Sequence, residues 1–198
     1  MSDPDTYRTI AKPGQSELRI KASRFFGFAE NVKTAEDADE HRTLLKKRYY
    51  DAAHQPFAYR LIDGTVRSSD DGEPKGTSGS SILKQIKNAQ LNNVQVVVIR
   101  YFGGTKLGKG GLARAFSEAA QLALDDALIE SVQITRRLEL TLPHEAVNTA
   151  KQIMAQFDAE IETINYSEKA YLLYVVPQNR YNDCMNAIIE RFGEGVVS

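Results

Sequence analysis

Apolar residues are distributed in two different ways along the first two thirds of this chain. Residues 94–102 form a long apolar run without strict alternation, which is typical of a strand buried on both faces. Before it, apolar side chains recur at helical spacing over about 82–89, and after it they recur along one helical side from about 111 to 129. The pattern therefore predicts a central strand with a helix on each side of it in sequence.

The N-terminal segment predicts a mixture of strands and one helix. Proline ahead of glycine at 12–15 indicates a turn, and Thr34 followed by acidic residues indicates a helix start. Asp63-Gly64 is a hairpin signal. The expected elements are strands over 7–11 and 16–31, a helix from Thr34 to about Tyr50, and a strand over 57–62 that turns at Asp63-Gly64.

After Ser131 the pattern restarts with the order β-α-β-β-α-β, which is that of a ferredoxin-like domain. We therefore expect an α+β protein with two domains, residues 1–132 and residues 133–198. The expected elements of the second domain are strand 133–142, helix 144–157, strands 160–166 and 170–176, helix 179–192 and a short strand at 196–197.

Charge changes this picture in one window. The net charge of the chain is only −1, yet the 43 residues of segment 75–117 contain no acidic residue, where a proportional share would be between five and six. The same window carries seven basic residues. Such local concentration predicts a focused positive potential that suits an anionic partner, although a solvated face is the alternative. The basic residues are Lys75, Lys84, Lys87, Arg100, Lys106, Lys109 and Arg114.

The glycine-rich loop 103–111 lies inside this window, between the apolar strand and the following helix. Glycines expose backbone N–H groups, and a helix N-terminus with nearby lysines attracts phosphate. Gly103, Gly108 and Lys109 fit the spacing of a phosphate-binding Walker loop, but Gly110 stands where serine or threonine must coordinate magnesium. We therefore expect phosphate binding without ATP or GTP hydrolysis. A dinucleotide-binding reading fits poorly, because five residues separate the strand from Gly108.

Three carboxylates fall within four residues at Asp70, Asp71 and Glu73. They suit a hard cation, or an acid and base pair, or a structural role in which Asp70 and Asp71 orient Arg100 or Lys106. The sequence leaves these alternatives open. We expect His54 to be a satisfied hydrogen-bonding residue.

Further chemistry is limited by composition. One cysteine excludes an internal disulfide, and Cys184 is expected to be a buried apolar residue. The three histidines lack ligand spacing, so no metal site and no cofactor are expected. No long apolar stretch exists, and the N-terminus is polar. The sequence therefore predicts no membrane span and no signal peptide, and we expect a cytoplasmic protein.

Tyr101 and Phe102 are candidates for stacking on nucleic-acid bases.

Three segments together resemble the IMPACT family, in its bacterial YigZ-like branch. They are residues 51–60 around His54, the acidic loop 69–79, and the strand end with the glycine-rich loop at 100–116. The resemblance covers about residues 16–130. The chain departs from the family pattern at Ser81, where a proline is usual, and at 55–57, which replaces the usual stretch after the histidine.

The resemblance implies a two-domain α+β protein. Its front domain is similar to domain IV of elongation factor G, and its back domain is ferredoxin-like. The resemblance also implies a role in translation, since eukaryotic relatives regulate translation under amino-acid starvation stress by competing for an activator of the initiation-factor kinase. It implies no catalytic activity.

Together the residues and the resemblance predict a non-enzymatic, cytoplasmic regulator of translation that binds RNA or the ribosome. One alternative is a regulator that acts through competition for a protein partner, and another is an enzyme for a small phosphorylated substrate bound near Gly110. Oligomeric state and partner identity stay open. The expected phosphate-binding residues are Lys84, Lys87, Arg100, Tyr101, Gly103, Gly104, Lys106, Gly108, Lys109, Gly110 and Arg114.

Overall fold

The computed structural model describes residues 5–197 and has the expected mixed α+β fold class. It divides into two compact units. One comprises Tyr7–Val132, and the other combines the described part of Met1–Thr6 with that of Gln133–Ser198. In the described part of the chain, no helix is both long and apolar enough to span a membrane.

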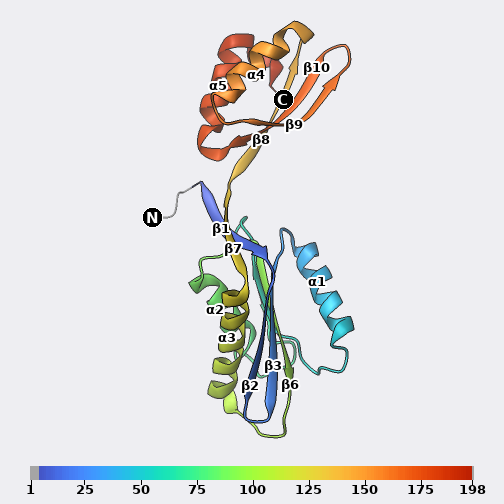
Figure 1. Cartoon of the computed structure of the whole chain (residues 1–198), viewed down its shortest axis with the longest axis vertical. Coiled ribbons are helices and arrows are strands. Elements are labelled where there is room, and N and C mark those ends of the chain that lie inside the picture. Colours follow the sequence, from blue (N-terminus) through green and yellow to red (C-terminus); the bar gives the residue numbers. More distant parts are fainter. Residues whose placement is uncertain (1–4, 198) are drawn as a thin grey trace. The chain divides into compact units, whose positions relative to one another are not determined.

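The larger unit is built on a five-stranded antiparallel sheet in the order β2-β3-β6-β4-β5. Helices α2 and α3 cover one face and α1 covers the other (Figure 1). The strands are β2 (Gly14–Ile20), β3 (Ser23–Asn31), β4 (Phe57–Arg60), β5 (Val66–Ser69) and β6 (Val94–Tyr101), and the helices are α1 (Ala35–Arg48), α2 (Gly79–Asn88) and α3 (Gly108–Asp126).

Strand β6 is the centre of this sheet, and the prediction that it is buried on both faces is confirmed. Its first six residues are buried, and apart from the polar Gln95 their side chains alternate between two apolar clusters. Val96 and Val98 belong to the cluster under α2 and α3. Val97 and Ile99 belong to the cluster under α1. A strand that packs against apolar groups on both faces has no solvent-exposed side for alternate polar residues. This explains the long apolar run.

The beginning of α1 was correctly predicted. Thr34 accepts a hydrogen bond from the Asp37 backbone N–H at 3.1 Å, and the Asp37 carboxylate accepts one from the Thr34 N–H at 3.1 Å. This reciprocal capping box satisfies two backbone donors at the helix start. The helix ends at Arg48, two residues before the expected end.

The expected single strand over 16–31 is wrong, because the chain turns at Lys21 and forms the β2–β3 hairpin. Lys21 has a φ of 53°, a conformation that glycine or asparagine usually supplies. The sequence shows no turn signal at this position. Pairing of β2 with β3 over Gly14–Ala29 to Ile20–Ser23 therefore overrides the local preference of Lys21.

The predicted boundaries of the long helix also need correction. Helix α3 begins at Gly108 rather than Gly111, so the glycines form its first turn. It ends at Asp126, because Ala127 is extended, and a strand follows that the sequence did not predict. This strand, β7 (Leu128–Gln133), pairs with β1 (Thr6–Lys12) in a separate two-stranded sheet.

The smaller unit has a three-stranded antiparallel sheet in the order β8-β10-β9 with two helices. Cys184 is fully buried in its core beside Met154, as expected, and burial raises the pKa of the thiol to about 11. The elements are β8 (Thr135–Leu142), α4 (Val147–Ala155), β9 (Glu160–Tyr166), β10 (Ala170–Pro177) and α5 (Tyr181–Phe192), with single 3₁₀ turns at His144–Ala146 and Gln178–Arg180 before the two helices.

The short strand expected at 196–197 does not form. The described chain instead makes a 3₁₀ turn over Glu194–Val196, and Val197 makes one isolated bridge to Leu140 of β8. Gly193, with a φ of 86°, ends α5 and turns the chain into this segment. One bridge places the segment beside the sheet without extending the sheet by a further strand.

We predict that a fragment of residues 6–133, which keeps both β1 and β7, folds without the rest of the chain. The apolar clusters of the larger unit share no residue with that of the smaller unit, so the fragment retains its own core. Thermal unfolding of the fragment should show a cooperative transition, and the full chain should show the same transition. A soluble fragment without a cooperative transition would contradict independent folding.

Candidate functional site

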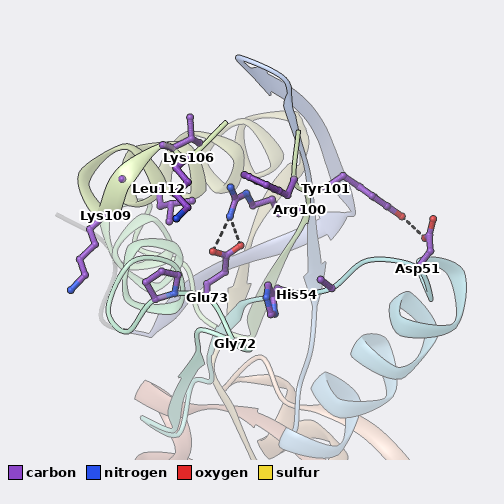
Figure 2. Close-up of a pocket in the computed structure, with 14 residues that line it drawn as sticks. Asp51, His54, Gly72, Glu73, Arg100, Tyr101, Lys106, Lys109 and Leu112 are labelled. Carbon is purple, nitrogen blue, oxygen red and sulfur yellow. Dashed lines mark hydrogen bonds and ion pairs between the residues drawn. The ribbon is translucent and has the colours of Figure 1, made fainter. Parts of the chain in front are cut away.

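A cavity of about 800 Å³ lies in the larger unit, where the carboxyl end of β6 meets the start of α3 (Figure 2). Two other segments complete it, the acidic loop and the stretch before β4. Glycine-rich, acidic and histidine-containing segments that are far apart in sequence therefore share one site. The lining residues are Asp51, Ala53, His54, Gly72, Glu73, Pro74, Arg100, Tyr101, Phe102, Lys106, Leu107, Gly108, Lys109 and Leu112.

A buried ion pair forms one wall of this cavity. The Arg100 Nη1 donates to both carboxylate oxygens of Glu73, at 2.8 and 3.0 Å (Figure 2). The two side chains are 10% and 3% exposed. The positive charge of Arg100 is therefore balanced inside the protein, and Glu73, not Asp70 or Asp71, orients it. We do not count Arg100 among the exposed cations of the site.

The other two acids have structural partners. Asp70 accepts hydrogen bonds from the backbone N–H groups of Gly76, Ser78 and Gly79 at 2.8–3.0 Å, and from the Ser78 hydroxyl at 2.7 Å. It thereby folds the acidic loop and satisfies donors at the start of α2. Asp71 accepts from the Gln55 N–H at 2.7 Å.

The three acids therefore face different partners. Within residues 5–197, no group of three or more His, Cys, Asp or Glu side chains is arranged to hold a metal ion. Burial tends to raise the pKa of Asp70, but the donors from Gly76, Ser78 and Gly79 outweigh burial and lower it below the ordinary value. Asp70 is thus an ionised structural group.

His54 lies beside the ion pair with its ring against Gly72 (Figure 2). A Cβ at Gly72 would lie 2.5 Å from two atoms of the His54 ring, and Gly72 has a φ of 89°, so only glycine fits there. The His54 backbone bridges Arg100 of β6. Contrary to expectation, its ring nitrogens make no hydrogen bond to any side chain or backbone group of residues 5–197.

The amino end of α3 forms the opposite wall and carries no negative charge. Its cap residue, Leu107, offers no side-chain hydrogen bond, and its first turn contains no acid. The first N–H groups of a helix lack partners within the helix and carry partial positive charge. Lys106 and Lys109 flank this end, are exposed, and form no ion pair with any described residue. We call these two lysines and the N–H groups of residues 108–111 the cationic rim.

The glycines of the loop have distinct roles. A Cβ at Gly103 would lie 2.0 Å from the Ala22 backbone, so this glycine lets the loop pass close to the β2–β3 turn. At Gly104, Gly108 and Gly110 an added Cβ would meet no atom within 4 Å. The space over these positions is open, so a ligand can approach their backbone directly. Gly104 and Gly108 also have φ values of 85° and 72°.

Two aromatic residues follow Arg100 at the end of β6. The Tyr101 hydroxyl donates to an Asp51 oxygen at 2.6 Å (Figure 2), and this hydrogen bond raises the pKa of Tyr101 to about 12. Phe102 is 58% exposed, and the Arg100 guanidinium lies 5.3 Å from its ring centroid. Tyr101 is thus fixed by a partner, whereas Phe102 presents an apolar ring to solvent beside the cationic rim.

The structure brings only some of the predicted site residues into the cavity. Arg100, Tyr101, Lys106, Gly108 and Lys109 line it, together with Glu73. Predicted residues outside the lining are Lys84 and Lys87, exposed on α2; Arg114, exposed on α3; Gly103, Gly104 and Gly110 of the loop and first helical turn; and Asp70 and Asp71 of the acidic loop.

Sequence reasoning missed several residues of the cavity wall. Asp51, Gly72, Leu107 and Leu112 lie in the three segments that carry the family resemblance, but nothing in their residue types marks them as site residues. The signal that could have found them is that these three segments occur together.

The fold agrees with comparisons to known proteins. Residues 21–124 match the model of the Impact N-terminal domain. The chain belongs to the IMPACT family.

Among its relatives, the IMPACT family member YvyE of Bacillus subtilis is 30% identical over 179 residues, covering 89% of this chain and 82% of YvyE. The IMPACT family member YigZ of Escherichia coli is 27% identical over 164 residues, covering 80% of this chain and 79% of YigZ. A crystal structure described as that of a hypothetical protein covers 98% of this chain and 96% of its own, with a TM-score of 0.74 and 23% identity. That likeness shows a shared fold.

We predict that replacing Glu73 with glutamine destabilises the protein by about 3–5 kcal/mol, because the buried Arg100 cation then lacks its counter-charge. The double variant Glu73→Leu/Arg100→Met should lose much less than the sum of the losses in Glu73→Leu and in Arg100→Met. Urea unfolding of the unchanged protein, these two single variants and the double variant gives the coupling energy. An exposed pair, Arg137–Glu162, is the control, and Glu162→Gln should change stability little. Additive losses at Glu73 and Arg100 would show that the pair is not a unit.

We also predict that Asp70 contributes to the pH dependence of stability. Its folded pKa is lowered, so its stabilisation is complete above the unfolded value of about 3.9 and is lost as pH falls through the folded pKa. Asp70→Asn should reduce the melting temperature at neutral pH and flatten its decline below about pH 4. If the melting temperatures of the two proteins fall by the same amount as the pH is lowered through the acid range, Asp70 does not have this role.

Proposed function

We propose that this chain is a non-enzymatic factor of translation that acts in the cytoplasm and binds RNA, free or within the ribosome, through the cationic rim. The observation that carries the proposal is the uncapped amino end of α3 with two exposed lysines, Lys106 and Lys109, which form no ion pair with an acid in the described part of the chain. A site of this kind favours an anion held close to the backbone. RNA carries such anions, its phosphates, one after another along the strand.

The chemistry of the rim suits phosphate oxygens. Helix N–H groups donate along the helix axis, and lysine ammonium groups add charge without fixed geometry. The backbone over Gly108 and Gly110 is open, so a phosphate can approach to hydrogen-bonding distance. Contacts of this type position a nucleic acid without reading its bases. We therefore expect weak sequence preference.

Further cations extend the surface beyond the cavity. Arg114 is exposed on α3, and Lys84 and Lys87 are exposed on α2. The two helices pack together, and the side chains of Gln85 and Ser117 are hydrogen-bonded. These three residues also form no ion pair with any other residue between 5 and 197. We assign them additional, exposed phosphate contacts.

A binding role without hydrolysis follows from the residue types at the loop. Gly110 supplies no hydroxyl for magnesium at the position where a Walker loop requires one. The carboxylates of Asp70, Asp71 and Glu73 are engaged by backbone donors or by Arg100. They are therefore not poised as a general base for phosphoryl transfer.

Membership of the IMPACT family supports translation as the process in which the chain acts. The resemblance implies translational control in eukaryotic relatives through competition for a protein partner. The cationic rim favours RNA over that alternative for this chain, because an unneutralised helix end with lysines is a general phosphate site. A protein partner would have to supply a carboxylate or phosphate to the same place.

We predict that the double variant Lys106→Ala/Lys109→Ala binds single-stranded RNA with a flatter salt dependence. Each phosphate contact contributes roughly −0.7 to the slope of log K against log salt concentration, so loss of two contacts flattens it by about 1.4. Affinity should fall by a similar factor for RNAs of different sequence. Fluorescence anisotropy titrations at several salt concentrations measure both quantities.

The matched control is Lys46→Ala/Lys47→Ala, which removes two exposed lysines from the last turn of α1, on the other face of the sheet. Its slope should equal that of the unchanged protein. If the slope is unaltered in the Lys106→Ala/Lys109→Ala variant, the cationic rim is not an RNA contact. Absence of RNA binding even at low salt would favour the protein-competition alternative.

A further inference from the structure

We propose that the cavity behind the cationic rim binds one nucleoside phosphate unit, with its phosphate at the amino end of α3 and its base against Phe102. This inference rests on the proposed function for the phosphate position, and it adds a defined ligand to the cavity itself. The same chemistry is available from a free mononucleotide and from the terminal nucleotide of an RNA strand.

The size of the cavity fits a ligand of this class. Its volume of about 800 Å³ lies within the range of roughly 300–1,000 Å³ that is typical of small-molecule sites. A surface that only tracks a sugar–phosphate backbone needs no such depth. The cavity therefore suits a ligand with a group that extends away from the sugar–phosphate backbone into the cavity.

The walls combine apolar and aromatic groups next to the anion site. Leu107 and Leu112 line the cavity from α3 and the residue before it, and the exposed ring of Phe102 stands at the end of β6. Aromatic side chains bind bases by stacking, whatever the base. Inorganic phosphate would use the rim but would leave these apolar walls without a partner. A nucleoside phosphate uses both.

Two polar groups of the cavity lack partners and suit a ligand with acceptor atoms. The Nε of Arg100 is buried on a side chain only 10% exposed, and no acceptor within residues 5–197 satisfies it. An unsatisfied buried donor is unfavourable, so a ligand acceptor reached by a shift of the guanidinium towards the cavity would relieve this cost. His54 likewise lines the cavity, and its ring nitrogens make no hydrogen bond to any of residues 5–197. Ribose and base both offer oxygen and nitrogen acceptors.

The buried ion pair determines how a strand can occupy the cavity. Arg100 and Glu73 close one wall with side chains that are almost fully buried. A nucleotide that enters must therefore leave its neighbours outside the mouth, beside Lys106 and Lys109. A terminal nucleotide has only one neighbour and meets this condition with the least distortion. If the source is RNA, we expect the end of the strand to bind.

The first test compares adenosine 5′-monophosphate with inorganic phosphate on the full chain by isothermal titration calorimetry. The nucleotide should bind at least about fivefold more tightly, the lower end of what stacking one base contributes. Phe102→Ala should remove that advantage and leave the affinity for inorganic phosphate within about twofold. Tyr50→Ala, at an exposed aromatic outside the cavity lining, is the control and should change neither value.

Equal affinity for nucleotide and inorganic phosphate would overturn the inference, and so would an undiminished nucleotide advantage in Phe102→Ala. Because Phe102 is 58% exposed, its removal leaves the apolar clusters intact. Thermal unfolding of the variant, with an unchanged midpoint, verifies this in the same samples.

The second test separates the two sources and separates this inference from the proposed function. A short single-stranded RNA is titrated in linear and in circularised form, with the mononucleotide as competitor. Displacement of the linear RNA alone assigns the cavity to a strand end. Salt-dependent RNA binding that the mononucleotide never displaces overturns the inference and leaves the proposed function standing. Nucleotide binding without RNA binding supports the inference with a free nucleotide as ligand and overturns the proposed function.

Discussion

The buried ion pair between Arg100 and Glu73 is the contact on which the whole site depends. It joins the end of the central strand β6 to the acidic loop, so that segments 27 residues apart in sequence enclose one cavity. A buried pair of this kind contributes little net stability, because desolvation offsets the attraction between the charges. Its effect is positional, since either charge alone in that environment would be strongly unfavourable.

The same pair explains why the site presents positive charge although three acids lie beside it. Glu73 is neutralised by Arg100, and Asp70 is surrounded by backbone donors at the start of α2. Asp71 accepts a hydrogen bond from the Gln55 N–H. None of the three carboxylates forms an ion pair with Lys106 or Lys109, so the rim keeps its charge. The amino end of α3 adds partial positive charge at the same place. The acidic loop therefore shapes the cavity without neutralising its mouth.

The sequence predicted those features that follow from local patterns. The helix start at Thr34 and the doubly buried strand β6 were predicted from the residue pattern of their own segments, and both are confirmed. The turn at Lys21 and the pairing of β7 with β1 depend on tertiary contacts, which a local pattern does not contain. The start of α3 was missed because glycines disfavour helix. Likewise, nothing in the sequence distinguishes Glu73 from Asp70 or Asp71 as the partner of Arg100.

We propose the amino end of α3 as the place where the chain binds phosphate. Nuclear magnetic resonance of the backbone amides, recorded while a short RNA is added, tests this most directly. The amide signals of residues 106–111 should shift first and furthest, because a phosphate bound at the amino end of α3 would contact their N–H groups. Shifts concentrated on α1 or on residues 135–197, with the amides of 106–111 unmoved, would contradict it.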